Sequence, residues 1–123
     1  MLTRVLVCSV LIVGCATEYS FPKDARSVSI ELPDGEHLAY KSISGANEQW
    51  VLDSLNHCRW VRDGAGPVSQ NYFRFELLRE NGHDIYGAIQ GAKLFISESS
   101  DVKKIYSCEI DEQLAVRFRT LYQ

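Results

Sequence analysis

The chain has 123 residues, with 13 basic and 16 acidic side chains and a formal net charge of −3. This length accommodates one domain and not two. Lys103-Lys104 is the only adjacent basic pair, which excludes a basic patch of the kind that follows nucleic acid. The alternating apolar runs after residue 26 exclude a chain that is disordered throughout.

The first fifteen residues have the features of an export signal. Arg4 gives the segment a positive start, and residues 5–13 form an apolar run that only Ser9 interrupts. This run is far shorter than the ~20 residues with which a helix crosses a bilayer. A charged start, a short apolar core and small residues at the end are typical of a secretory signal.

The end of this segment, Leu11-Ile12-Val13-Gly14-Cys15, resembles the lipobox of bacterial lipoproteins, in which Cys15 takes the invariant position. The resemblance implies cleavage before Cys15, acylation of its sulfur with fatty acids such as palmitate, and a lipid-anchored protein of the cell envelope. In a two-membrane bacterium, Ala16 at the next position implies the outer membrane, with the domain facing the periplasm. The bilayer is then one partner, reached through acylated Cys15.

Two other interpretations of the segment stay open. Gly14-Cys15-Ala16 also fits an ordinary small-x-small cleavage site that releases a soluble protein, and an uncleaved segment would act as an anchor. We expect a signal peptide over 1–14, a lipidated cysteine and tether over 15–26, and a single periplasmic or extracellular domain over 27–123.

The four cysteines reduce to one candidate pair. Cys8 leaves with the signal and Cys15 carries lipid, so Cys58 and Cys108 remain in an oxidising compartment, where a disulfide is the default. Free thiols and a metal site are the alternatives. No C-x-x-C or H-x-x-x-H spacing occurs, so we expect neither a metal nor another cofactor.

The first half of the domain predicts a hairpin followed by a helix. Apolar residues alternate over 27–32, Pro33-Asp34-Gly35 is typical of a turn, and 38–43 is the weaker partner strand. Asn47 is a candidate helix N-cap. The expected buried side of this helix comprises Trp50, Val51, Ser54, Leu55 and Cys58.

From Tyr72 onward the alternation is strong enough to set a register. A three-residue loop with left-handed Gly82 pairs Leu77 with Ile85, whereas a two-residue turn would point the isoleucines to the wrong face. The same register places Gly87 opposite Phe75 and leaves room for the ring. The further expected pairs are Phe73 with Ile89, Ile89 with Leu94 and Gly87 with Ile96, while Tyr106, Cys108 and Ile110 continue this face on a fourth strand.

Asp111 is expected to cap a final helix with an apolar stripe. The element order is then β-β-α-β-β-β-β-α, an α+β fold whose two helices cover one face of an antiparallel sheet. Cys108 points into that face and Cys58 lies on the buried side of the first helix. A disulfide between them would join helix to sheet.

The sequence carries no recognisable catalytic motif. His37, His57 and His83 are expected at the periphery, because catalytic histidines need an oriented partner that nothing here specifies. We therefore expect no catalytic or cofactor-binding residues and no enzyme.

The sheet face away from the helices is the candidate partner surface, with an aromatic patch rimmed by charge. It carries Tyr72, Arg74, Tyr86, Phe95 and Ile105. We expect a membrane-anchored envelope lipoprotein with a small protein-binding domain that is accessory or inhibitory and binds an envelope protein, not nucleic acid. A module for small ligands or cell-wall fragments is the alternative and would need a concave pocket, and a small envelope enzyme is the third.

Overall fold

The computed structural model describes residues 18–34, 37–68 and 71–123. The strands are β1 (Glu18–Tyr19), β2 (Ala25–Asp34), β3 (His37–Ile43), β4 (Trp60–Asp63), β5 (Phe73–Arg79), β6 (Ile85–Gln90), β7 (Lys93–Glu98) and β8 (Asp101–Glu109). The helices are α2 (Gly45–His57) and α3 (Glu112–Thr120).

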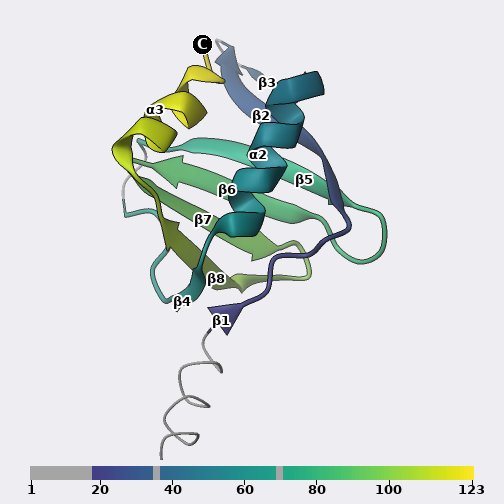
Figure 1. The fold of residues 1–123 in the computed structure, drawn as a ribbon, viewed down its shortest axis with the longest axis vertical. Coiled ribbons are helices and arrows are strands. Elements are labelled where there is room, and N and C mark those ends of the chain that lie inside the picture. Colours follow the sequence, from purple (N-terminus) through teal and green to yellow (C-terminus); the bar gives the residue numbers. More distant parts are fainter. Residues whose placement is uncertain (1–17, 35–36, 69–70) are drawn as a thin grey trace, which may run out of the picture.

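All the strands join one antiparallel sheet in the order β1-β4-β8-β7-β6-β5-β2-β3. Both helices lie on the same face of this sheet (Figure 1). The α+β class and the antiparallel sheet are thus confirmed. The expected element order lacks two short strands, β1 and β4.

The two predicted hairpin registers are confirmed. β5 and β6 pair Leu77 with Ile85 and Phe75 with Gly87, and Gly82 in the connecting loop has a φ of 111°. β6 and β7 pair Ile89 with Leu94 across a tight turn. These registers turn the large aliphatic side chains to the face that the helices cover, so local alternation determines which side of the sheet is buried.

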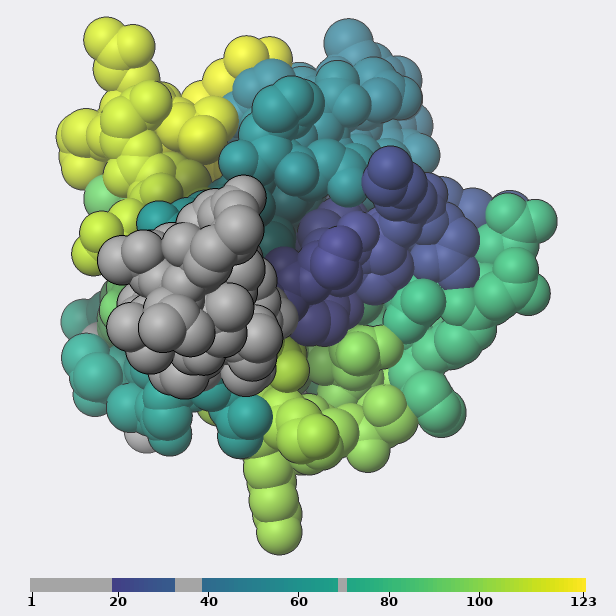
Figure 2. Space-filling model, turned by 60° about the horizontal axis from the view of Figure 1, so that its bottom comes forward, coloured from purple at the N-terminus to yellow at the C-terminus, as the bar shows by residue number. Residues whose placement is uncertain are grey.

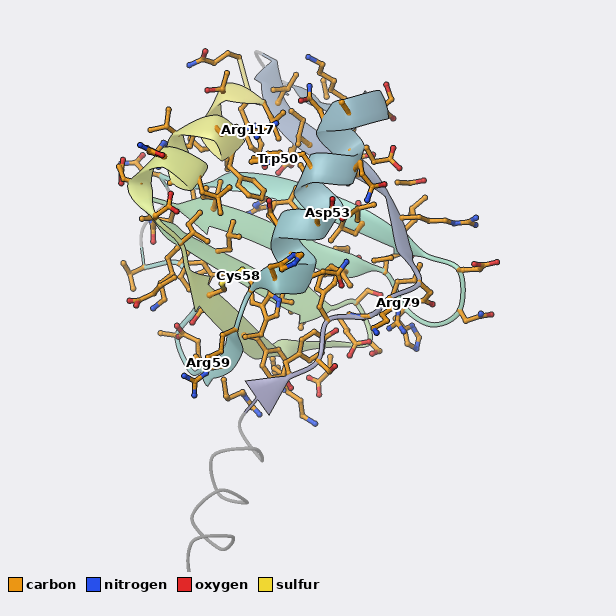
Figure 3. All side chains as sticks on the ribbon, in the orientation of Figure 1. Trp50, Asp53, Cys58, Arg59, Arg79 and Arg117 are labelled. Atoms are coloured by element: carbon orange, nitrogen blue, oxygen red, sulfur yellow. A yellow bond between two sulfur atoms is a disulfide. The ribbon has the colours of Figure 1, made fainter. Side chains whose placement is uncertain are left out.

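Aromatic rings fill the space between the helices and the sheet. Phe118 of α3 is 1% exposed, and its ring centroid lies 4.8 Å from that of Trp50 on α2 and 6.5 Å from that of Phe75 on β5. The guanidinium of Arg117 covers the Trp50 ring at 4.0 Å from its centroid (Figure 3). The two helices therefore contact each other as well as the sheet, and their aromatic side chains pack together between the helices and the sheet.

The helix starts differ in how well the sequence predicts them. Asp111 caps α3 as expected, because its Oδ1 accepts a hydrogen bond of 2.8 Å from the Leu114 N–H. The expectation that Asn47 caps α2 is wrong. The N-cap is Ser44, because β3 ends at Ile43 and the chain turns into the helix within one residue.

The expected tether over 15–26 is wrong for residues 18–26, which belong to the folded domain. Phe21 is only 7% exposed, and Tyr19 pairs with Trp60 of β4. Asp24 holds the β5–β6 hairpin by accepting hydrogen bonds from Arg79 Nε at 3.0 Å and from the Asn81 N–H at 2.8 Å. Figure 2 shows the purple residues of this segment against the green residues of the hairpins. Residues 1–17, with Cys15 and the signal segment, lie outside the described residues.

Gly87 gives a direct test of the register. A methyl group at this position would overlap the Phe75 ring. We expect Gly87→Ala to lower the free energy of unfolding by about 1–3 kcal/mol in urea titrations, the usual cost of an overpacked core. Gly64→Ala is the matched control, because its methyl group would meet no atom within 4 Å. Equal transition midpoints for the two variants would contradict the packing.

Candidate functional site

The predicted disulfide between Cys58 and Cys108 is present, with the two Cα atoms 5.9 Å apart. It joins the C-cap residue of α2 to β8, as the sequence suggested (Figure 3). Free thiols and metal ligation are excluded for these two residues. In the chain-entropy model, a cross-link over 50 residues raises stability by roughly 4 kcal/mol. The bond thus stabilises the contact between the end of α2 and β8.

The uncovered face of the sheet contains a hollow with a volume of about 530 Å³. All five residues of the predicted partner surface line it, so the alternation along the strands correctly brings them together. They come from four places in the chain: the segment before and within β5, then β6, β7 and β8. These residues are Tyr72, Arg74, Tyr86, Phe95 and Ile105.

These five residues are not equally accessible. Tyr86 is 45% exposed and stands at the rim, whereas Phe95 is 5% exposed and forms part of the floor. Ala88, which pairs with Phe95, is 7% exposed. Phe95 therefore shapes the hollow but offers little surface to a partner, unlike the exposed side chain that the pattern suggested.

The hollow also includes residues that the sequence reasoning missed. Glu31 and Tyr40 come from β2 and β3, Pro67 comes from the loop after β4, and Val102 comes from the start of β8. The alternation over 27–32 did point Glu31 away from the core. What it could not show is that β2 pairs with β5, with Ile30 opposite Phe75, which places Glu31 beside the Arg74 side chain.

One fixed cation lies at the rim of this hollow. Arg74 Nη2 donates a hydrogen bond of 2.9 Å to the Tyr72 hydroxyl, and Arg74 Nε lies 3.7 Å from Glu31 Oε2. The hydrogen bond that Arg74 donates to the Tyr72 hydroxyl and the nearby Glu31 carboxylate both raise the pKa of Arg74. Glu76 adds a second carboxylate to the lining. The surface thus combines aromatic rings with charges of both signs and favours a ligand that offers apolar and polar groups together.

The histidines do not contribute to the hollow. His57 is exposed in the last turn of α2, where its Nδ1 lies 2.7 Å from the carbonyl oxygen of Asp53. His83 is exposed in the β5–β6 hairpin, and the side chain of His37 lies outside what the structure describes. None of the described residues that line the hollow is a histidine or a cysteine.

Over residues 18–34, 37–68 and 71–123, no group of three or more His, Cys, Asp or Glu side chains is arranged to hold a metal ion.

Neither α2 nor α3, the two helices of the described part of the chain, is long and apolar enough to cross a membrane.

A carboxylate fixes the loop that forms one wall of the hollow. Asp63 Oδ1 accepts a hydrogen bond of 3.0 Å from the Ala65 N–H, and Asp63 Oδ2 lies 3.1 Å from Lys93 Nζ. The backbone hydrogen bond and the ammonium group together lower the pKa of Asp63 from 3.8 to about 2. These contacts hold the turn that carries Pro67 to the hollow.

No protein-family model matches the chain, and the comparisons with curated proteins and with solved structures found no match either.

The carboxylate of Asp63 predicts an acid-sensitive stability. Because its folded pKa of about 2 lies below its ordinary value of 3.8, the stabilisation is complete above pH 4 and is lost as the pH falls toward 2. We expect Asp63→Asn to remove about 1–2 kcal/mol at pH 7 and to flatten the decline between pH 4 and pH 2. Urea titrations across this range measure both effects. An equally steep decline in the variant would show that other groups cause it.

Proposed function

We propose that this chain is an envelope lipoprotein, held in the membrane by acyl chains on Cys15, whose domain binds another envelope protein. The segment that resembles a lipobox supports the anchor. The disulfide supports export, because such bonds form and persist in oxidising compartments. Two or three acyl chains would hold the protein firmly, whereas one chain binds only marginally.

The observation that carries the binding role is the hollow on the uncovered sheet face. It combines a buried aromatic floor at Phe95 with an exposed aromatic rim at Tyr86 and a fixed cation at Arg74. A protruding side chain of a partner would bury against the floor while Tyr86 and Arg74 contact the surface around it. Buried anchors of this kind, often with Tyr and Arg, dominate the energetics of protein interfaces. The domain would act by occupying a surface of its partner, as accessory and inhibitory modules do.

The concave shape of this face favours a second candidate, a small ligand or a cell-wall fragment. A volume of about 530 Å³ lies within the ~300–1,000 Å³ that small-molecule sites occupy. Aromatic rings with adjacent carboxylate and guanidinium groups suit a ligand that has apolar faces and polar edges. We propose a binding role in either case and assign no catalytic residue.

The anchor is tested with Cys15→Ser. We expect the substitution to move nearly all of the protein from the membrane pellet to the soluble fraction of the producing bacterium, because the acylated sulfur is lost. Immunoblots of the two fractions measure this. A variant that stays in the pellet would show that something other than acylation holds the chain.

The binding face is tested with Tyr86→Ser in the mature domain, with light crosslinking in the source envelope and identification of the captured proteins. Phe95 is left unchanged, because its burial makes its removal destabilising. We expect a discrete protein with the parent domain and roughly 30-fold weaker capture with the variant. Val116→Ser is the matched control, since Val116 is 50% exposed on α3, on the opposite layer.

Equal capture by the parent and by both variants would contradict a protein partner at this face. A thermal-shift screen of cell-wall fragments tests the second candidate function, the binding of a small ligand. Stabilisation of the parent domain that Tyr86→Ser abolishes would support a small ligand instead.

A further inference from the structure

The folded domain begins very close to the proposed lipid anchor. β1 starts at Glu18, so only residues 16 and 17 separate it from Cys15. The three steps from Cys15 to Glu18 span at most about 11 Å of fully extended chain. A tether over 15–26 would have reached several times farther.

The start of the domain is also firmly attached, so it cannot lengthen the link without loss of core contacts. The ring of Tyr19 stacks on that of Tyr106 with 4.5 Å between their centroids, and Tyr19 pairs with Trp60 in the sheet. Phe21 follows in the core, and Asp24 binds Arg79. Release of this segment would expose aromatic surface and separate an ion pair, which makes the short link a fixed property of the fold.

The strand register shows which surface faces the anchor. β1 runs antiparallel to β4, so the chain enters β1 at the end of the sheet where β4 finishes with Asp63. Asp63 pairs with Ile105, so the first half of β8 lies at the same end. β1, β4 and β8 lie together at the lower end of the domain in Figure 1.

This end of the sheet carries three exposed basic side chains. Arg62 and Lys103 are exposed, and the side chain of Lys104 is 57% exposed with its Nζ 3.7 Å from Asp101 Oδ2. The other acidic side chains described there are also in ion pairs: Asp63 with Lys93, and Glu98, which lies opposite Asp101, with Arg79. Each cation close to an anionic bilayer strengthens membrane binding by roughly fivefold.

From this placement we infer that the domain lies directly on the membrane, with the β1–β4–β8 end against anionic lipid head groups. The inference rests on the proposed acylation of Cys15 and adds a second contact with the same bilayer. β3, at the opposite edge of the sheet, is then the strand farthest from the lipid. Seven strand spacings separate β1 from β3 in the sheet order, roughly 34 Å along the sheet. The hollow extends from Ile105 on β8 to Tyr40 on β3, so its β8 side is the one nearer to the membrane.

The test measures the distance of two labelled positions from the head groups. The acylated full-length protein is reconstituted into vesicles of phosphatidylglycerol and phosphatidylethanolamine that carry a spin label on some head groups. A fluorophore is attached at Lys103→Cys on β8 or, as the matched control, at Lys41→Cys on β3, since both are exposed lysines on strands. Mass analysis of peptides first verifies the acyl groups and the disulfide between Cys58 and Cys108.

We expect quenching at position 103 to exceed that at position 41 several-fold. Insertion of about twelve Gly and Ser residues before Glu18 should remove most of this difference, because the flexible link then spans roughly 20 Å. Equal quenching at both positions of the acylated protein with the original link would overturn the membrane contact and leave the anchor intact. An N-terminal peptide without acyl groups would overturn both.

Discussion

The fold depends on one long connection, which carries the chain from β3 at one edge of the sheet to β4 near the other. Six strand spacings separate these strands in the sheet order, roughly 29 Å. The thirteen residues of α2 cover about 20 Å of this path. At its far end, the disulfide from Cys58 to β8 and the hydrogen bond of 3.0 Å from Trp60 Nε1 to the Leu55 carbonyl fix where the helix stops. Because this crossing uses one face of the sheet, neither described helix lies on the opposite face (Figure 1).

The sequence predicts the features that local alternation determines. The registers of the β5–β6 and β6–β7 hairpins follow from side-chain periodicity and turn residues, and they agree with the structure. The disulfide follows from counting, because the predicted signal cleavage and lipidation leave only Cys58 and Cys108. β1 and β4 were missed for a physical reason: strands of two and four residues are too short to show a period. Their partners lie far away in the sequence, as Tyr19 does from Trp60.

For the candidate site too, the sequence predicts what depends on a single strand and misses what depends on contacts between distant strands. Tyr72, Arg74, Tyr86, Phe95 and Ile105 were assigned to one face from alternation, and all of them line the hollow. The shape of the hollow also depends on residues from other segments, such as Glu31 and Tyr40. Glu31 reaches Arg74 only because β2 pairs with β5. Phe95 lies on the face without helices and is still only 5% exposed, with Lys93 Nζ 5.5 Å from its ring centroid. The face of a residue follows from its own strand, whereas its exposure depends on contacts between strands that are distant in the sequence.

The same strands connect the proposed anchor with the proposed binding surface. β4 pairs with β1 on one side and with β8 on the other, and Ile105 of β8 lines the hollow. Asp63, the last residue of β4, holds the turn that brings Pro67 to the same hollow. One wall of the hollow is thus built on β4, the strand that pairs with β1, where the link to Cys15 enters the domain. With Cys15 acylated as proposed, about 11 Å of chain would separate anchor and domain, and a ligand at this wall would lie close to the bilayer. This geometry favours a partner that is itself embedded in the membrane or bound to its surface.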